Sequence, residues 1–137
     1  MYPEEGQGKK RPNRLQRAGE DYLKTILLLQ MANGGVRSSD VAKELKVSKA
    51  SVCNALKRLQ ARGFLTMDPD KLIRLTGLGR EMAQQVMERY FVLKRCLIFM
   101  GVDPQIAHED ACRMEHDASP ETVERMRHFV LQTDDPA

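Results

Sequence analysis

Apolar residues recur every three or four positions over most of the chain, a spacing that predicts amphipathic α-helices. The first predicted helix begins near Leu15 and ends before Asn33, which two glycines follow. In residues 64–67 and 72–75 the period shortens to two, which is typical of short strands joined as a hairpin. The predicted fold class is therefore mainly α, with one small hairpin.

Two short helices are predicted between the first helix and the hairpin. Ser38 or Ser39 can cap the first of them. Ser48 follows a tight break and can cap the second, which runs to about Arg62 before Gly63 ends the helical pattern. Two short helices around a tight break, followed by a hairpin, are the order of elements in a winged helix-turn-helix.

The remainder of the chain is predicted to be entirely helical. Thr76 can cap a long helix that continues to about Met100. Asp103 stands before a proline and starts the next helix, and Ser119, again before a proline, starts a last helix that ends near Leu131. These patterns divide the chain into a flexible basic arm at residues 1–13, a winged helix-turn-helix domain at 14–76 and a helical domain at 77–137.

Composition narrows the class of protein. The aromatic fraction is 5% with no Trp, so the core must be aliphatic, which favours helix packing. No apolar run reaches the length of a membrane span, and the charged N-terminus does not have the pattern of a secretory signal. The three cysteines are an odd number without framework spacing, so we expect a cytoplasmic protein rather than a membrane protein, a large enzyme or a disulfide scaffold.

Charge is unevenly distributed along the chain. Residues 1–62 hold 13 Lys and Arg and 6 Asp and Glu. Residues 103–137 hold 3 Lys and Arg and 9 Asp and Glu. The net charge of the whole chain, +3, hides this polarity. A cationic N-terminal half indicates a polyanionic partner, and together with the helix-turn-helix it indicates double-stranded DNA.

The start of the third predicted helix carries the candidate DNA-binding residues. Asn54 can pair with adenine, and the methyl group of Ala50 can contact thymine in the major groove. Cationic side chains nearby suit the phosphates. The predicted DNA-binding residues are Ser48, Lys49, Ala50, Ser51, Asn54, Lys57 and Arg58. A winged helix that serves only as a protein-interaction module is the alternative from another class.

A second cluster lies on the penultimate predicted helix. Residues three and four apart share one helix face, and one side of this helix therefore presents His108, Cys112, Glu115 and His116. Imidazole, thiolate and carboxylate groups bind divalent cations, although a second segment must complete the coordination shell. The structural alternative is a packed Cys112 with solvated neighbours. A catalytic pair of Cys112 and His116 is disfavoured, because no oxyanion loop accompanies it.

These residues give the sequence its similarity to a known family. From about Gly19 to Leu131 the chain resembles the diphtheria-toxin-repressor and manganese-transport-regulator family of metal-dependent transcription factors. The similarity is carried by residues 20–26, by the winged helix over 36–75, and by 108–116 with the segment 101–103 before them. The resemblance implies a non-enzymatic, homodimeric repressor that binds a pseudo-palindromic operator and senses Fe(II) or Mn(II).

The resemblance also implies a ligand set for one ion per chain. Its members are Asp21 from the first helix and Cys112, Glu115 and His116 from the helical domain. The set is a hybrid, because Asp at position 21 is typical of the manganese branch and Cys at position 112 is typical of the iron branch. The helical domain at 77–137 is accordingly expected to bind metal and to form the dimer.

The second metal site of the family departs from its usual pattern in this chain. His108 is retained as a possible second-site remnant, but Tyr90 stands where a His is usual. Lys24 and Lys94 stand where branches of the family have Glu, and a protonated lysine does not bind a metal ion. Two alternatives follow: an ammonium group substitutes for the missing cation, or the protein has lost metal control.

On this interpretation, the ion links the first helix to the helical domain and so sets the distance between the two winged helix-turn-helix domains of the dimer. The long helix and the last two helices would form the dimer interface. The candidate interface residues are Val86, Leu93, Leu97, Val123, Met126 and Val130. These residues could equally well belong to the core of a single chain.

Overall fold

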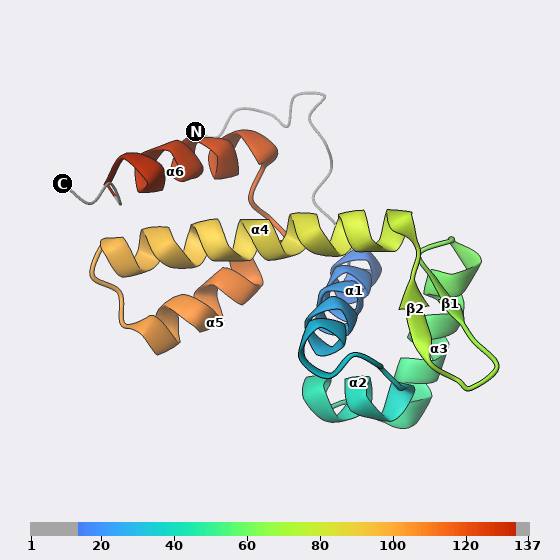
Figure 1. Ribbon diagram of the computed structural model, residues 1–137. Coiled ribbons are helices and arrows are strands. Elements are labelled where there is room, and N and C mark those ends of the chain that lie inside the picture. Colours follow the sequence, from blue (N-terminus) through green and yellow to red (C-terminus); the bar gives the residue numbers. More distant parts are fainter. Residues whose placement is uncertain (1–13, 134–137) are drawn as a thin grey trace.

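The computed structural model describes residues 14–133, which form six helices and a two-stranded antiparallel sheet. The arm predicted at residues 1–13 lies outside the described residues. In chain order, the elements are α1 (Arg14–Asn33), α2 (Ser38–Leu45), α3 (Lys49–Ala61), β1 (Leu65–Met67), β2 (Ile73–Leu75), α4 (Gly77–Phe99), α5 (Pro104–Met114) and α6 (Pro120–Thr133). The predicted fold class, a winged helix-turn-helix followed by a helical domain, is confirmed (Figure 1).

Helix α4 is the long axis of the molecule. In Figure 1 it runs from the hairpin to the far end of the helical domain, with α1 below its N-terminal half and with α5 and α6 on opposite sides of its C-terminal half. The larger core joins α1, α2, α3, the hairpin and the start of α4, and Leu23 and Ile26 of α1 are almost completely buried in it. A smaller core of Tyr90, Leu93 and Ala111 joins α4 to α5. Helix α1 therefore belongs to the winged-helix half while it also packs against α4.

Most of the predicted helix starts are confirmed by a capping hydrogen bond. The side chains of Ser48, Thr76 and Asp103 each accept a backbone N–H from the first turn of the helix that follows, at 3.0 to 3.1 Å. Such bonds satisfy donors that the helix itself leaves unpaired. Gly79 lets α4 approach the hairpin, because a Cβ at this position would lie 1.9 Å from the carbonyl oxygen of Phe64.

The predicted cap of α2 is wrong. The helix begins at Ser38 with Arg37 as its N-cap, so neither Ser38 nor Ser39 caps it. The Asp40 carboxylate instead accepts the backbone N–H of Arg37 at 2.9 Å. The carboxylate of the third helical residue thus satisfies the N–H of the N-cap, and it also suits the helix dipole.

The hairpin is the wing of the fold. Its strands pair antiparallel, with Thr66 opposite Arg74. The Asp68 carboxylate accepts the backbone N–H of Leu72 at 3.0 Å and so closes the turn. Ile73 donates its backbone N–H to the carbonyl of Val36 at 2.8 Å, which fastens the wing to the segment before α2.

The residues predicted for the dimer interface belong largely to the core of a single chain. Met126 is half-buried, and the other five are buried, namely Val86, Leu93, Leu97, Val123 and Val130. The monomer-core alternative is thus correct for these five. Exposed apolar side chains on α4 and α6 include Phe91, Phe99 and Phe129, and the rings of Phe99 and Phe129 meet edge to face at 5.4 Å. None of the helices in residues 14–133 has the length and apolarity to cross a membrane.

Candidate metal centre and nucleic-acid interface

The candidate metal centre lies where the N-terminal half of α1 meets the end of α5. Glu20 and Asp21 are neighbours on α1. Helix α5 ends at Met114 with Glu115 as its C-cap, and His116 follows in the turn. The prediction that the cluster from position 108 to position 116 lies on one continuous helix is therefore wrong. Glu115 still has helical backbone angles and donates its N–H to the carbonyl of Ala111, whereas His116 reaches α1 from the turn.

The ring of His116 lies between two carboxylates of α1. Its Nδ1 is 2.7 Å from Oε2 of Glu20, and its Nε2 is 2.9 Å from Oδ1 of Asp21. The Nε2 atom is also 3.5 Å from Oε1 of Glu115. The His116 and Glu115 side chains are 3% and 0% exposed, whereas the Asp21 side chain is 46% exposed. The centre is thus buried at His116 and Glu115 and open to solvent at Asp21.

These contacts change the protonation of the histidine. Burial lowers the pKa of His116, but the hydrogen bonds to Asp21 and Glu20 and the charges of Asp21 and Glu115 outweigh it and raise the pKa to about 9. At neutral pH the metal-free centre therefore holds an imidazolium that donates to both carboxylates. A metal ion can take the Nε2 position only when this proton leaves.

Three of the four predicted ligands converge. One ligand atom each from Asp21, Glu115 and His116 lies within 4.8 Å of the others. Two carboxylates and an imidazole are a donor set that fits Mn(II) or Fe(II). Glu20 was missed by the sequence analysis, although it is the acidic neighbour of Asp21. Its bond to Nδ1 fixes the ring so that Nε2 faces the other donors, an orientation typical of metal-binding histidines.

Cys112, the fourth predicted ligand, lies beside Lys24 rather than in the group of three. Its Sγ is 3.9 Å from Nζ of Lys24. Burial raises the pKa of the Cys112 thiol, and this outweighs the opposite effect of the Lys24 charge. The thiol must therefore lose a tightly held proton before it can act as a ligand, and its role as a ligand stays a prediction.

Lys24 forms a largely buried ion pair with Glu115. Its ammonium group donates to both carboxylate oxygens of Glu115 at 3.0 Å, and the two side chains are 12% and 0% exposed. Burial raises the pKa of Glu115, while the charge of Lys24 and its hydrogen bonds act in the opposite direction. The same ammonium group lies 4.5 Å from the centroid of the Tyr90 ring.

The remaining residues of the expected second site lie around Tyr90. The Tyr90 hydroxyl shares a hydrogen bond with Nδ1 of His108, whose residue is exposed. Lys94 places its ammonium group 5.6 Å from the centroid of the same ring. His108 thus has a phenol as its neighbour and is not part of the group formed by Asp21, Glu115 and His116.

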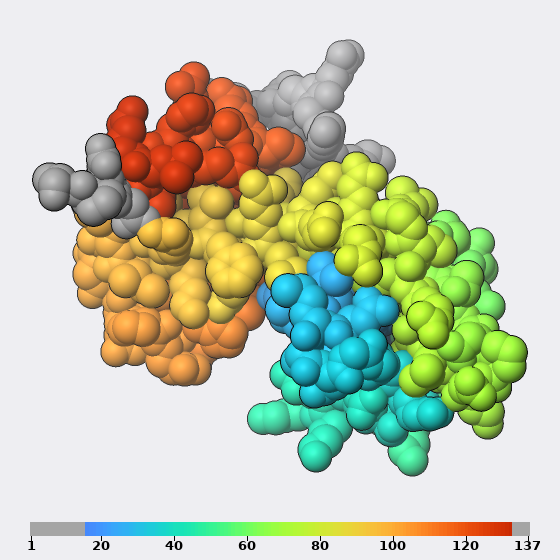
Figure 2. Space-filling view, in the orientation of Figure 1, coloured from blue at the N-terminus to red at the C-terminus, as the bar shows by residue number. Residues whose placement is uncertain are grey.

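The predicted DNA-binding residues lie together on an exposed face. All seven are exposed, namely Ser48, Lys49, Ala50, Ser51, Asn54, Lys57 and Arg58. The hydroxyls of Ser48 and Ser51 bond each other at 2.9 Å as part of the helix cap, and the roles of all seven residues in DNA contact stay a prediction. In Figure 2 the teal residues of α2 and the start of α3 project from the lower edge of the molecule, away from α5 and α6.

Comparisons with known proteins agree with both halves of this arrangement. Residues 14–73 match the family described as "Iron dependent repressor, N-terminal DNA binding domain". Residues 76–135 match "Iron dependent repressor, metal binding and dimerisation domain". The transcriptional regulator MntR of Salmonella typhimurium is 38% identical over 113 residues, which are 82% of this chain and 72% of that protein. The HTH-type transcriptional regulator MntR of Listeria monocytogenes is 32% identical over 111 residues, 81% of this chain and 78% of that protein.

Solved structures give the same fold. The manganese regulator SloR superposes with a TM-score of 0.74 and 25% identity, over 82% of this chain and 53% of that chain. ScaR with bound Zn²⁺ has a TM-score of 0.70 and 27% identity, over 82% of this chain and 53% of that chain. The chain thus spans about half the length of these two solved chains. Together, the two domain families and the relatives show that the chain belongs to the iron-dependent repressor family of metal-dependent, DNA-binding transcriptional regulators.

Proposed function

We propose that the protein is a cytoplasmic, homodimeric repressor that binds a pseudo-palindromic operator when one Fe(II) or Mn(II) ion per chain occupies the candidate centre. The observation that carries this proposal is the convergence of Asp21, Glu115 and His116 within 4.8 Å, from two halves of the chain. Cys112 remains the candidate fourth ligand. A bound ion would supply a positive charge that donors from both halves share.

The location of the donors suggests how the ion would act on DNA binding. Asp21 lies on α1, whose Leu23 and Ile26 are embedded in the core that also holds α2 and α3. Glu115 and His116 lie at the end of α5, which packs on the opposite half of α4. Ligands in both halves therefore make the ion sensitive to their relative orientation. The ion favours DNA binding only as far as it binds the DNA-competent arrangement more tightly than the relaxed one.

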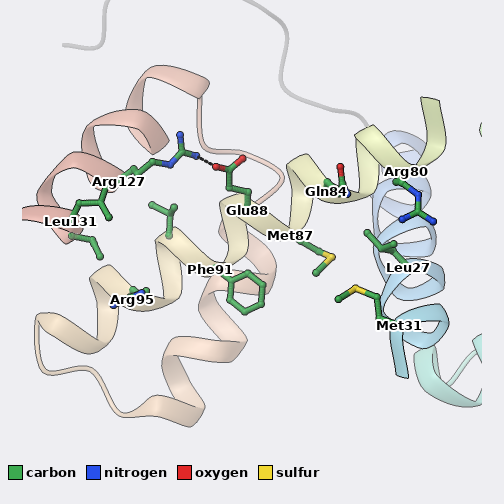
Figure 3. Close-up of a pocket in the computed structure, with 12 residues that line it drawn as sticks. Leu27, Met31, Arg80, Gln84, Met87, Glu88, Phe91, Arg95, Arg127 and Leu131 are labelled. Carbon is green, nitrogen blue, oxygen red and sulfur yellow. Dashed lines mark ion pairs between the residues drawn. The ribbon is translucent and has the colours of Figure 1, made fainter. Parts of the chain in front are cut away.

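The dimer is proposed to form through the helical domain. The exposed rings of Phe99 and Phe129, which meet on this domain, are a supporting observation because contiguous apolar patches on a surface mark interaction sites. Figure 3 shows Phe91 at an apolar groove between α1, α4 and α6, with Arg127 and Glu88 paired at 2.6 Å on its rim. A two-fold dimer would present two copies of α3 to two half-sites.

The test is DNA binding with and without the ion. Duplexes would be selected from a random pool on protein loaded with Mn²⁺, or with Fe²⁺ under anaerobic conditions, and affinity then measured by fluorescence anisotropy before and after chelation. We expect chelation to weaken binding. His116→Ala should abolish the response to the ion, whereas His128→Ala, at an exposed histidine of α6, should retain it. Failure to select any duplex would favour the protein-interaction module, and chelator-insensitive binding would favour a regulator without metal control.

A further inference from the structure

We propose that Lys24 is a tethered cation, which takes the place of a second metal ion and links α1 to the end of α5 when the primary ion is absent. This inference rests on the proposed function and concerns the size of its metal response. Both oxygens of Glu115 lie at 3.0 Å from Nζ, the Cys112 sulfur at 3.9 Å and the Tyr90 ring centroid at 4.5 Å.

These neighbours form a shell for a cation. A carboxylate, a sulfur and the face of an aromatic ring each attract positive charge. The Lys24 side chain is only 12% exposed and that of Glu115 is 0% exposed, so water screens the pair weakly. A divalent ion at this position would have to displace a covalently attached competitor. The chain therefore carries its own monovalent cation there.

Glu115 is shared between this cation and the candidate metal centre. Its Oε1 lies 3.0 Å from Nζ of Lys24 and 3.5 Å from Nε2 of His116. The same carboxylate therefore faces the ammonium group and the position where the primary ion is proposed. Lys24 belongs to α1 and Glu115 to the end of α5, so their ion pair spans the two halves that the ion is proposed to join.

The Lys24–Glu115 ion pair has two consequences for the response of DNA binding to the metal ion. First, the link between α1 and α5 persists after chelation, so the metal-free dimer keeps part of its affinity for DNA. Second, a second divalent ion is excluded. The ion pair favours the joined arrangement with or without metal, and it therefore reduces the factor by which the primary ion raises DNA affinity.

The first arm of the test removes the charge of Lys24. Lys24→Gln should lower the DNA affinity of the chelated dimer by about tenfold and should raise the activation ratio between Mn²⁺-saturated and chelated protein. Lys24→Arg should restore the chelated affinity, because it keeps the charge. Arg113→Gln, which removes an exposed cation at the end of α5, is the matched control and should change neither quantity. A general loss of structure would lower both affinities together, which circular dichroism and thermal unfolding would reveal.

The second arm measures stoichiometry by titration calorimetry with Mn²⁺. Wild type should bind one ion per chain, whereas Lys24→Glu, which replaces the cation with a carboxylate, should bind two. Unchanged chelated affinity in a folded Lys24→Gln, or one ion per chain in Lys24→Glu, would overturn the inference. The metal-loaded Lys24→Glu variant keeps the test decisive if Lys24→Gln does not fold. A chelator-insensitive wild type would instead refute the proposed function, while the effect of Lys24→Gln on chelated protein would still test the inference.

Discussion

Binding of a metal ion should release the proton that His116 holds. The pKa of His116 is raised to about 9 in the metal-free protein, so at pH 7 the protonated form exceeds the neutral form by about a hundredfold. An ion that binds at Nε2 must displace this proton, at a free-energy cost of about 2.7 kcal/mol at pH 7. The apparent affinity for the ion should therefore rise steeply with pH.

The size of the change in apparent Kd with pH distinguishes a histidine with this raised pKa from one with the usual pKa. With a pKa of about 9, the apparent Kd for Mn²⁺ should fall about 80-fold between about pH 6.5 and about pH 8.5. A histidine with its usual pKa of about 6.5 would give only about a twofold change over the same range. The two cases are therefore easily distinguished. The apparent Kd falls as pH rises because, throughout this pH range, the raised pKa makes the proton compete with the metal ion for Nε2.

The assay is titration calorimetry of Mn²⁺ in buffers that differ in ionisation enthalpy, which reports the number of protons released. We expect about one proton at pH 7 if Cys112 remains a thiol. Burial raises the pKa of Cys112, so its recruitment as a thiolate would release a second proton and double the slope. The measurement therefore also decides whether Cys112 is a ligand.

Glu20 provides the internal control for this reasoning. Its hydrogen bond to Nδ1 is one of the causes that raise the pKa of His116, so Glu20→Gln should make the pH dependence shallower. His128→Ala should leave the dependence unchanged, because His128 lies exposed on α6. A wild-type affinity that changes only about twofold across the range, with no proton released, would refute the assignment of His116 as the proton-holding ligand.

The remaining predictions concern stability, metal choice, DNA and assembly. Because the folded-state pKa of His116 lies above its unfolded value, His116 should contribute up to about 3 kcal/mol to the unfolding free energy of metal-free protein below about pH 6.5. This contribution should be lost as pH rises through about 9, which the difference between urea titrations of wild type and His116→Ala would measure. Cys112→Glu should shift preference toward Mn²⁺ over Fe²⁺ in anaerobic competition titrations, because a carboxylate is harder than a thiolate; an unchanged ranking would mean that Cys112 is not a ligand. In anisotropy titrations, log affinity for DNA should fall with log salt by about 0.9 per phosphate neutralised; Lys57→Ala should weaken all duplexes alike, and Asn54→Ala should relax base preference. Phe99→Asp should shift the protein toward monomer in sedimentation velocity, whereas an unchanged dimer would place the interface elsewhere.

The elements could be predicted from the sequence where their signals are local. Ser48, Thr76 and Asp103 each stand at the start of a helix, and a cap needs only the next three residues. The wing is local as well, since Asp68 closes its own turn. The error at α2 has the same origin, because several polar residues compete within one turn. Arg37 became the N-cap there, and the Asp40 carboxylate accepts its backbone N–H.

The centre could be predicted only in part because its contacts join distant segments. Asp21 and His116 are 95 positions apart, and no periodicity reports whether their atoms meet. Helix α5 ends at Met114 without a glycine or proline to mark the stop, so the spacing from His108 to His116 wrongly indicated one helical face. Apolar spacing likewise identified Leu93 as inward-facing but did not say whether the partner surface belonged to the same chain.

The charges of the centre support the proposal that one ion binds per chain. Without metal at neutral pH, the carboxylates of Glu20, Asp21 and Glu115 face the ammonium group of Lys24 and the imidazolium of His116, so one negative charge is in excess. When a divalent ion replaces the imidazolium proton, the group becomes neutral. A second divalent ion would leave two positive charges in a largely buried site, which is costly at low effective dielectric. A carboxylate at position 24 would reverse this balance, because four carboxylates and a neutral imidazole match two divalent ions. We therefore expect the stoichiometry of the centre to depend on the charge of Lys24, and we expect its ion pair with Glu115 to persist when the ion leaves.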